Sequence, residues 1–419
     1  MKLLWLCNMV PGKVKEAVSG QSAGGGLWVD SVLEGLLERE NLEIRILCPG
    51  DGGEGTVNEK CSYAFFSEGL PYVYLPELEK QFRRELDSFC PDVIHVWGTE
   101  YGHTLAMVNA AGKAEKLDNL AISIQGLCSV CARHYAEGVP GKIQRGSTFR
   151  DLVRQDNIVK QQEKFVLRGV LEVESLRKAR NIIGRTDWDR ACVRQINPEA
   201  QYHFCNETLR QPFYQGAWCY DSCQKHRIFA SSCAYPVKGF HYLLEAFGQI
   251  VKDYPDATLA VPGKSFLTAS RLRRTNYQKY LAELARDKGV EDKIEFLGSL
   301  SAERMREEFL RANAFALPST IENSPNSLGE AMLLGVPCVA ADVGGVTTML
   351  RHGEEGFVYP STASYMLAYY LERVFDMEEK AREMGAAAAA HAGRTHDPEK
   401  NLETLLEIYR DLEKGRKTP

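Results

Sequence analysis

The stretch Ser319-Thr320-Ile321-Glu322-Asn323-Ser324-Pro325-Asn326-Ser327-Leu328-Gly329-Glu330-Ala331 joins an apolar run to a helix expected to begin within residues 324–327. The first amides of a helix have no intrahelical acceptor and lie at the positive end of its dipole, so this helix start suits a diphosphate. Glu322 precedes the helix, and Glu330 lies about one turn inside it. These two carboxylates can accept hydrogen bonds from the hydroxyls of a sugar and of a ribose.

The same residues also have a purely structural interpretation. Ser327-x-x-Glu330 fits a capping box, in which Glu330 satisfies a backbone N–H of its own helix. On this stretch alone, both interpretations stay open.

Two further loops in the second half of the chain suit an anion. Tyr235-Pro236-Val237-Lys238-Gly239-Phe240 leads from a strand to a helix, and a lysine beside a glycine there can place a compact positive charge on a phosphate. Asp342-Val343-Gly344-Gly345-Val346 joins another strand to a helix through paired glycines. A solvated loop lysine is the alternative for Lys238, but three such loops together favour a phosphate site.

Strand and helix signals alternate along the whole chain of 419 residues. Short apolar runs separated by amphipathic stretches predict an α/β protein with parallel sheets covered by helices on both faces. The expected strands are 3–8, 42–48, 92–98, 120–126 and 180–184 in the first half, and 227–231, 258–261, 294–297, 314–317, 336–340 and 356–358 in the second. Ligands bind such sheets at the carboxyl ends of the strands, so functional residues are expected just after them.

The length and the pattern predict two Rossmann-like domains. The first comprises residues 1–205, and the second comprises residues 226–390. The linker 206–225 interrupts the pattern with proline, glycine and clustered aromatic residues, and residues 391–419 form a last helix that can pack back toward the first domain. Two sheets whose crevices face each other predict a deep interdomain cleft.

Charge and hydropathy exclude other classes of protein. Lys and Arg total 51 against 56 Asp and Glu, a formal net charge of −5, so no nucleic-acid partner is expected. The longest apolar opening, 3–10, is far shorter than the roughly 20 residues that span a bilayer, and we expect a cytoplasmic protein. Within residues 130–195, Lys and Arg outnumber Asp and Glu, which favours either attraction to anionic lipid headgroups or a solvated helical face.

Two nucleotide motifs and a zinc site are also excluded. Pro262-Gly263-Lys264-Ser265 is similar to the end of a P-loop, but Thr258 stands where the first glycine is required. The run of glycines at 24–26 lacks the spacing of the dinucleotide fingerprint. The cysteine pairs 128/131 and 219/223 each have one histidine nearby, which is too few ligands for zinc, so no metal is expected.

The segment from Glu322 to Pro337, together with Gly344-Gly345, resembles the retaining glycosyltransferases of family 4 (glycosyl transferases group 1), which have the GT-B fold. The shared features are two glutamates separated by seven residues, a Gly-x-Pro strand entry and a Gly-Gly loop. Lys238-Gly239 stands where that family has its phosphate-binding lysine. The resemblance is strong over residues 227–360 and diffuse before them.

The resemblance implies a role for each matching residue. Glu322 would lie beside the donor sugar, Lys238 would neutralise the diphosphate, and Glu330 would bind the ribose. The amides near Ser327 and Leu328 would hold the distal phosphate. The further donor-binding residues that it implies are Asn326, Gly344 and Gly345, with Gly24, Gly25 and Gly26 in the first domain.

Two positions depart from the family pattern. Cys233 replaces an arginine that many relatives have five positions before the lysine, so another cation would have to supply that charge. Gln125 replaces a histidine; a glutamine orients a hydroxyl but cannot act as a base, and we keep Gln125 among the catalytic candidates. The candidates on the acceptor side are His95, His103, Arg133 and Arg185, the two histidines having a structural role as the alternative.

The resemblance implies a metal-independent, retaining transferase of the hexosyltransferase type. It would move a sugar from a nucleotide-diphospho-sugar, with a UDP-sugar as the first choice, to a hydroxyl of a glycan, lipid-linked or small-molecule acceptor, as in polysaccharide biosynthesis. No cofactor would be required, and peripheral attachment to the inner face of the membrane would fit a lipid-linked acceptor. The alternatives are a sugar phosphorylase or nucleotide-sugar epimerase of the same fold, or a non-catalytic nucleotide-sugar-binding subunit.

Overall fold

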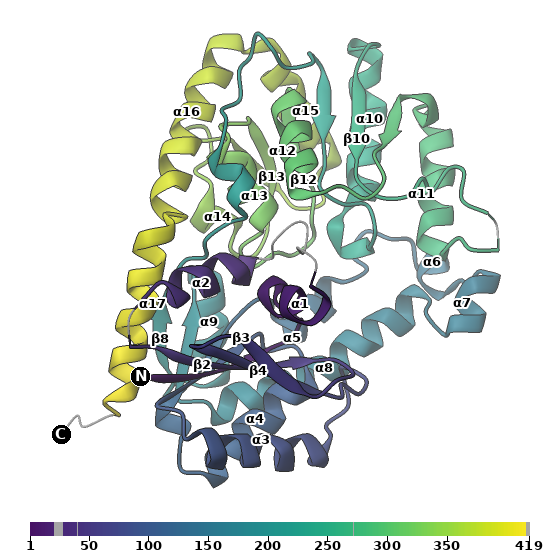
Figure 1. Cartoon of the computed structure of the whole chain (residues 1–419). Helices are drawn as coiled ribbons and strands as arrows, with labels where there is room; N and C mark the ends of the chain where they lie inside the picture. The colour runs from purple at the N-terminus through teal and green to yellow at the C-terminus, as the bar shows by residue number, and fades with distance from the viewer. Residues whose placement is uncertain (21–27, 40, 271, 416–419) are drawn as a thin grey trace. The chain divides into compact units, whose positions relative to one another are not determined.

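The chain divides into two compact units (Figure 1). The first unit comprises residues 1–130, 164–210 and 396–419, and the second comprises residues 131–163 and 211–395. The computed structural model describes residues 1–20, 28–39, 41–270 and 272–415. The predicted glycine loop Gly24-Gly25-Gly26 therefore lies outside the described residues.

The grouping differs from the predicted boundaries in one long segment, because residues 131–163 belong to the second unit. Hydrogen bonds tie this segment to the rest of that unit. Thr320 Oγ1 donates to the His134 carbonyl at 2.9 Å, and the Asn276 amide donates to the Asp151 carboxylate at 2.8 Å. The last residues, 396–419, belong to the first unit.

The first unit contains an eight-stranded sheet in the order β3-β4-β2-β1-β5-β6-β7-β8. The strands are β1 (Lys2–Cys7), β2 (Glu43–Pro49), β3 (Glu54–Asn58), β4 (Cys61–Phe66), β5 (Val93–Trp97), β6 (Leu120–Ser123), β7 (Asn181–Gly184) and β8 (Gln201–Phe204). Within the described ranges, neighbouring strands are parallel except β3 and β4. A parallel sheet must be covered on both faces, which explains why its strands are continuously apolar.

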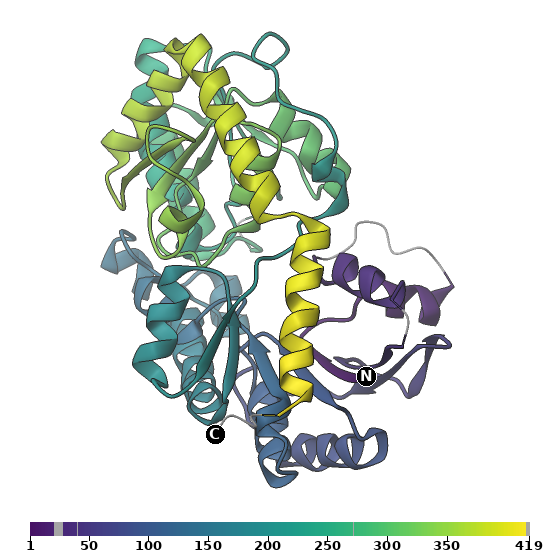
Figure 2. The same ribbon diagram turned by 90° about the vertical axis from the view of Figure 1, so that its left-hand side faces the viewer.

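Helices cover both faces of this sheet. Alternate residues of β1 face opposite sides, so that Trp5 packs in one apolar cluster and Leu4 in the other. The first cluster includes residues of α1 (Gly12–Ser19), α2 (Trp28–Leu37) and α17 (Pro398–Glu413), which lies along the unit in Figure 2. The second includes residues of α3 (Pro76–Phe89), α4 (Gly102–Lys113), α8 (Ile158–Lys178) and α9 (Asp187–Ile196).

The second unit contains a six-stranded parallel sheet in the order β11-β10-β9-β12-β13-β14. Its strands are β9 (Arg227–Phe229), β10 (Thr258–Val261), β11 (Ile294–Phe296), β12 (Ala314–Leu317), β13 (Cys338–Asp342) and β14 (Phe357–Pro360). Its longer helices are α10 (Phe240–Asp253), α11 (Asn276–Asp287), α12 (Ala302–Arg311), α13 (Asn326–Leu333), α15 (Ser364–Asp376) and α16 (Glu378–Thr395).

The order of the strands places a ligand site in the second unit. Numbered within the unit, the six strands run 3-2-1-4-5-6, the order of the doubly wound Rossmann sheet. From β9 the strands are added toward one edge of the sheet, and from β12 they are added toward the other edge. Such a topological switch point leaves a crevice at the carboxyl ends of the two strands. The loops after β9 and β12 are therefore the two loops best placed for a ligand.

The predicted α/β class with two Rossmann-like sheets is confirmed, and each expected strand is present within a few residues of its predicted bounds. The prediction missed three strands, β3, β4 and β8, at the two edges of the first sheet. The outermost two, β3 and β8, are more polar, because edge strands expose one side to water, whereas β4 is mostly buried between β3 and β2. Among the described residues, no helix combines the length and the apolar character needed to cross a bilayer.

Candidate functional site

The two loops at the switch point of the second unit bring Lys238 and Glu322 together. Lys238 ends a short 3₁₀ turn, Pro236–Lys238, after β9, and Glu322 lies in the loop after β12. Lys238 Nζ lies 2.6 Å from Glu322 Oε1, and Ser319 Oγ donates to the same oxygen at 2.7 Å. These two predicted catalytic residues are 84 positions apart in the sequence. They meet because β9 and β12 are neighbours in the sheet and the loops after them start at the same edge.

Backbone contacts lock the two loops against each other. The Thr320 amide donates to the Val237 carbonyl at 2.9 Å. Gly239 has φ of +63°, and a Cβ atom there would lie 1.8 Å from the Pro318 carbonyl oxygen. The glycine after the lysine is therefore required by both conformation and space, and it fixes where the Lys238 side chain begins.

The Lys238 ammonium is held charged. Burial alone would lower its pKa, but the Glu322 carboxylate outweighs burial and the pKa of Lys238 is raised. The side chain is still 36% exposed, so that an anion can reach it. A lysine that is permanently charged and accessible from one side suits a phosphate ligand.

The Gly344-Gly345 loop, which leads from β13 to a short helical turn, fixes the backbone of Glu322. The Gly345 amide donates to the Glu322 carbonyl at 3.1 Å. Gly344 has φ of +53°, and a Cβ atom there would lie 1.8 Å from the same carbonyl oxygen. The predicted glycine pair is thus beside Glu322, where its role is to let two backbones approach closely.

Replacing Gly344 with alanine is expected to destabilise the protein by about 2–4 kcal/mol, because the methyl group meets backbone and adds left-handed strain. Gly353 is the matched control: it has φ of +78°, and its added Cβ meets nothing within 4 Å. Gly353→Ala therefore measures the cost of the conformation alone, about 1 kcal/mol. Thermal or urea unfolding of both variants checks the difference, and equal losses would contradict the close approach at Gly344.

The helix α13 begins shortly after Glu322 in the same loop. The helix begins at Asn326 after Pro325, and the amides of its first residues precede any intrahelical acceptor. Ser231 Oγ, just after β9, donates to Ser327 Oγ at 3.2 Å, which ties the helix start to the first loop. The Leu328 amide already donates to the Pro325 carbonyl at 2.9 Å, so the amides of Asn326 and Ser327 are better suited to a phosphate.

Glu330 is buried in the second turn of α13, with 2% of its surface exposed. The capping-box interpretation requires Ser327 to precede the helix, but Ser327 is its second residue and the Pro325 N-cap has no side-chain cap. That alternative is wrong. Glu330 is thus a buried carboxylate one turn from the start of α13.

Two polar residues of this site were missed by the sequence analysis. Ser319 and Ser231 follow β12 and β9 directly and contact Glu322 and Ser327. Their position just after predicted strands was the available signal. Cys233, by contrast, is buried, its Sγ lies 3.9 Å from the Pro262 carbonyl oxygen, and burial raises the pKa of its thiol to about 11. Cys233 therefore supplies no positive charge.

Arg133 lies in the same unit as Lys238. It is exposed near the end of α5 (Cys128–His134), and the carbonyl of the next residue, His134, accepts the hydrogen bond from Thr320. Arg133 thus belongs to a helix end that contacts the loop carrying Glu322.

The remaining predicted residues belong to the first unit. Gln125 and Arg185 follow β6 and β7 and meet at Glu207, whose Oε1 accepts from Gln125 Nε2 at 2.9 Å and from an Arg185 nitrogen at 2.7 Å. Arg185 also contacts Gln125 Oε1 at 3.4 Å. Glu207 was missed because it lies in the irregular linker, where the sequence gives no spacing signal.

His95 and His103 are both buried, as expected for histidines with a structural role. His95 lies inside β5, bonded to Tyr409 Oη at 2.6 Å and Ser123 Oγ at 2.7 Å, and burial lowers its pKa to about 3. His103 is buried in α4, where its ring stacks on Tyr101, and burial also lowers its pKa to about 3. Neither imidazole ionises near neutral pH. In the described ranges, no three His, Cys, Asp or Glu side chains gather as a metal site.

Comparisons with known proteins identify the family that the second unit resembles. Residues 224–391 match the model of the family Glycosyl transferases group 1. The D-inositol 3-phosphate glycosyltransferase of Corynebacterium urealyticum is 28% identical over 176 residues, which cover 42% of this chain and 41% of that protein. The match to this curated relative thus spans about two fifths of its length.

Solved structures match the whole chain at low identity and show its fold. The sucrose-phosphate synthase of Thermosynechococcus elongatus has a TM-score of 0.71 at 17% identity, covering 98% of this chain and 99% of that chain. Anabaena HepE in complex with UDP-glucose has a TM-score of 0.68 at 17% identity, with the same coverage. Residues 224–391 therefore form a Glycosyl transferases group 1 domain in a chain that has the two Rossmann-like units of the GT-B fold.

Proposed function

We propose that the chain is a retaining glycosyltransferase of family 4 that moves a hexose from a UDP-sugar to a hydroxyl group of a glycan, lipid-linked or small-molecule acceptor, without a metal ion. The observation that carries the proposal is the Lys238–Glu322 pair beside the start of α13, at the switch point between β9 and β12. The match of this domain to Glycosyl transferases group 1 supports it, and the UDP-glucose named in the HepE complex supports the choice of donor.

Each part of the site has a task in this reaction. The diphosphate binds Lys238 Nζ and the first amides of α13, and the ribose hydroxyls bind the Glu330 carboxylate. Glu322 lies beside the sugar, where its negative charge stabilises the positive charge that develops at C1. Lys238 and the helix dipole take over the charge of the leaving group, a task that a metal ion performs in other transferases.

The chemical step is a front-face substitution. The C1–oxygen bond to the diphosphate breaks, with its electron pair leaving on the phosphate oxygen. The acceptor hydroxyl oxygen bonds to C1 from the same face, and its proton passes to the departing phosphate. The products are the glycosylated acceptor, with retained configuration, and UDP. In the first unit, the Gln125–Glu207–Arg185 cluster is proposed to orient the acceptor hydroxyl.

A donor panel tests the proposal. The chain is incubated with UDP-, GDP- and ADP-sugars, with and without sugar acceptors, while nucleoside diphosphate release and the product anomer are followed. We expect UDP release that an acceptor accelerates and a product of retained configuration. In a parallel incubation with a glycan and inorganic phosphate, release of sugar 1-phosphate would identify a phosphorylase. Conversion of the donor without an acceptor would identify an epimerase, and intact donor would identify a binding subunit.

Glu330→Gln is expected to weaken UDP binding about 10-fold or more, because a carboxylate that accepts from two ribose hydroxyls is replaced by a neutral amide of the same shape. Calorimetric titration with UDP measures the loss. The control ligand is 2′,3′-dideoxy-UDP, which has no ribose hydroxyls. Wild type and Glu330→Gln should bind this analogue equally, and an equal loss for both ligands would assign Glu330 a structural role.

A further inference from the structure

One surface of the second unit exposes large apolar side chains. Phe149, Leu152 and Val153 of α7 (Phe149–Arg154) are 63%, 67% and 68% exposed, and Leu272 in the loop before α11 is 66% exposed. The first three have the i, i+3, i+4 spacing of one helix face. We call these four residues, together with Arg154 and Arg273 beside them, the α7 surface. The neighbouring Arg150 is ion-paired with Asp151 at 3.1 Å and with Asp156 at 3.7 Å.

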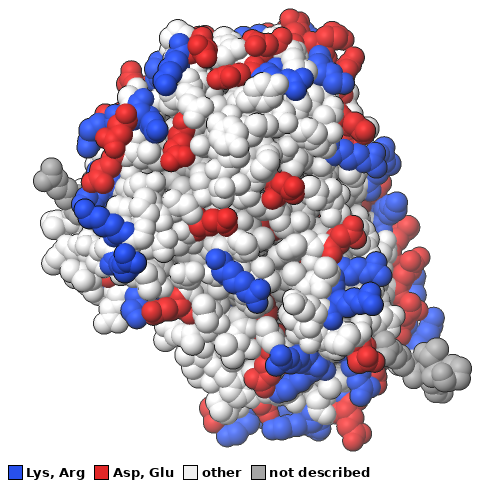
Figure 3. All heavy atoms as spheres, turned by 180° about the vertical axis from the view of Figure 1, so that it is seen from behind, with Lys and Arg blue, Asp and Glu red and all other residues white. Residues whose placement is uncertain are grey.

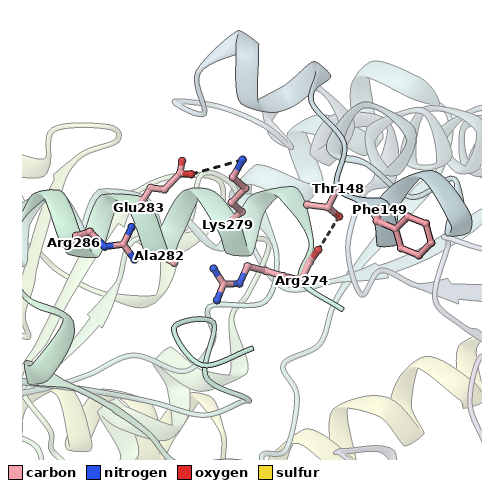
Figure 4. Close-up of a pocket in the computed structure, with 7 residues that line it drawn as sticks. All are labelled: Thr148, Phe149, Arg274, Lys279, Ala282, Glu283 and Arg286. Atoms are coloured by element: carbon pink, nitrogen blue, oxygen red, sulfur yellow. Dashed lines mark hydrogen bonds and ion pairs between the residues drawn. The ribbon is translucent and has the colours of Figure 1, made fainter. Parts of the chain in front are cut away.

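The opposite face of α7 is firmly anchored, so its apolar face is fixed toward solvent. Thr148 and Asp151 form a capping box, and Thr148 Oγ1 donates to the Arg274 carbonyl at 2.7 Å. Asp151 also accepts from the Asn276 amide at the start of α11. Figure 4 shows Thr148 joined to Arg274 and the Phe149 ring directed away from the α11 helix.

Two open hollows flank Phe149. One, of about 400 Å³, is lined by Thr148, Phe149, Arg274, Lys279, Ala282, Glu283 and Arg286, drawn in Figure 4. The other, of about 450 Å³, is lined by Phe149, Arg150, Val153, Arg154, Leu272 and Arg273. Their charged lining residues are arginine or lysine apart from Glu283. On the face drawn in Figure 3, uncharged side chains fill much of the middle, and basic and acidic side chains lie together along the rims.

The combination of apolar residues and a basic rim indicates the occupant. Exposed apolar side chains that an anchored helix cannot turn inward mark an interaction site. Arginines around them favour a partner with a dense negative charge next to an apolar layer, which is the structure of an anionic lipid surface. We propose that the α7 surface docks the chain on an anionic bilayer, with the apolar residues at the headgroup boundary and the arginines on lipid phosphates.

The proposal replaces the broad expectation for residues 130–195 with a defined surface, and it does not depend on the identity of the sugar donor. Docking there would hold a membrane-embedded acceptor at the same surface as the enzyme. A second copy of this chain would cover the same residues by another kind of contact, and dimer formation is a distinguishable outcome of the experiment below.

The test is co-sedimentation of the purified full chain with vesicles of phosphatidylcholine alone or mixed equally with phosphatidylglycerol, in 50 and 500 mM NaCl. We expect binding to the mixed vesicles that is at least about 10-fold tighter than to phosphatidylcholine alone and that weakens at high salt. The triple variant F149S/L152S/V153S and the charge variant R154E/R273E should each lose about 10-fold or more. Calorimetric UDP binding should be unchanged, which separates this proposal from the donor site.

The matched control is Y365S/Y369S on α15, which removes two aromatic side chains that are 64% and 49% exposed in the same unit. Its vesicle binding should equal that of the wild type. No binding to anionic vesicles at low salt, or equal losses in all three variants, would overturn the proposal. So would a chain that forms dimers which F149S/L152S/V153S separates without any vesicle binding, because the surface would then join two copies.

Discussion

Lys238→Ala is expected to weaken UDP binding about 10- to 100-fold and to leave uridine binding within about twofold. The ammonium is paired with Glu322 and is proposed to contact only the diphosphate of the ligand, so a ligand without phosphates should not detect its loss. Calorimetric titration of both ligands measures the difference. Because the same charge stabilises the leaving group, kcat should also fall, by about 10²- to 10³-fold.

Lys264→Ala is the matched control for this prediction. Lys264 also stands beside a glycine in the loop after a strand of the same sheet, but that strand is β10, one position away from the switch point. Its removal should change UDP affinity less than about threefold. If Lys238→Ala weakened uridine as much as UDP, or if both lysine variants lost the same affinity, the assignment of Lys238 to the diphosphate would fail.

Glu322→Gln is expected to lower kcat about 10²- to 10³-fold without weakening UDP binding. The carboxylate is proposed to stabilise positive charge at the sugar, which UDP lacks. In the ligand-free protein, Glu322 also holds the Lys238 ammonium at 2.6 Å, so a phosphate has to compete for it. A neutral glutamine removes that competition, and UDP affinity should stay equal or rise. Of the two variants of this ion pair, only Lys238→Ala is therefore expected to lose UDP affinity.

Ser319→Ala provides a graded comparison, because it removes one hydrogen bond to Glu322 and keeps the charge. We expect it to lower kcat about 3- to 10-fold. Steady-state kinetics on the preferred donor measure both variants, and their melting temperatures show whether the fold is intact. A loss of UDP affinity in Glu322→Gln that matches the loss in Lys238→Ala would mean that the pair is a structural ion pair.

The strands of both sheets could be predicted well because each buried strand is marked by a pattern within a few consecutive residues. Strands buried on both faces, such as β1 and β12, must be continuous apolar runs, and these runs are visible in one sequence. The loops after β9 and β12 could then be expected to lie close together, because parallel strands end at the same edge of a sheet. This reasoning correctly brought Lys238 and Glu322 together, although no local pattern relates two residues 84 positions apart.

The failures involve contacts that no local pattern encodes. The structure groups residues 131–163 with the second unit, since Asp151 bonds to a residue 125 positions later. The contact between His95 and Tyr409, 314 positions away, could likewise not be read from a local pattern. The contact between Glu207 and Gln125 depends on the path of the irregular linker, which the sequence does not reveal. The capping box at Ser327, one of the two interpretations left open, does not form, because Pro325 precedes the first turn of α13.

The central claim is that the loops after β9 and β12 and the start of α13 hold a nucleoside diphosphate, and a crystal structure of the chain with UDP tests it most directly. We expect a phosphate oxygen within hydrogen-bond distance of Lys238 Nζ and of the Asn326 or Ser327 amide, with the ribose hydroxyls on Glu330. The account would be contradicted if UDP bound elsewhere, with Lys238 still paired with Glu322 and no phosphate oxygen near Lys238 or the start of α13.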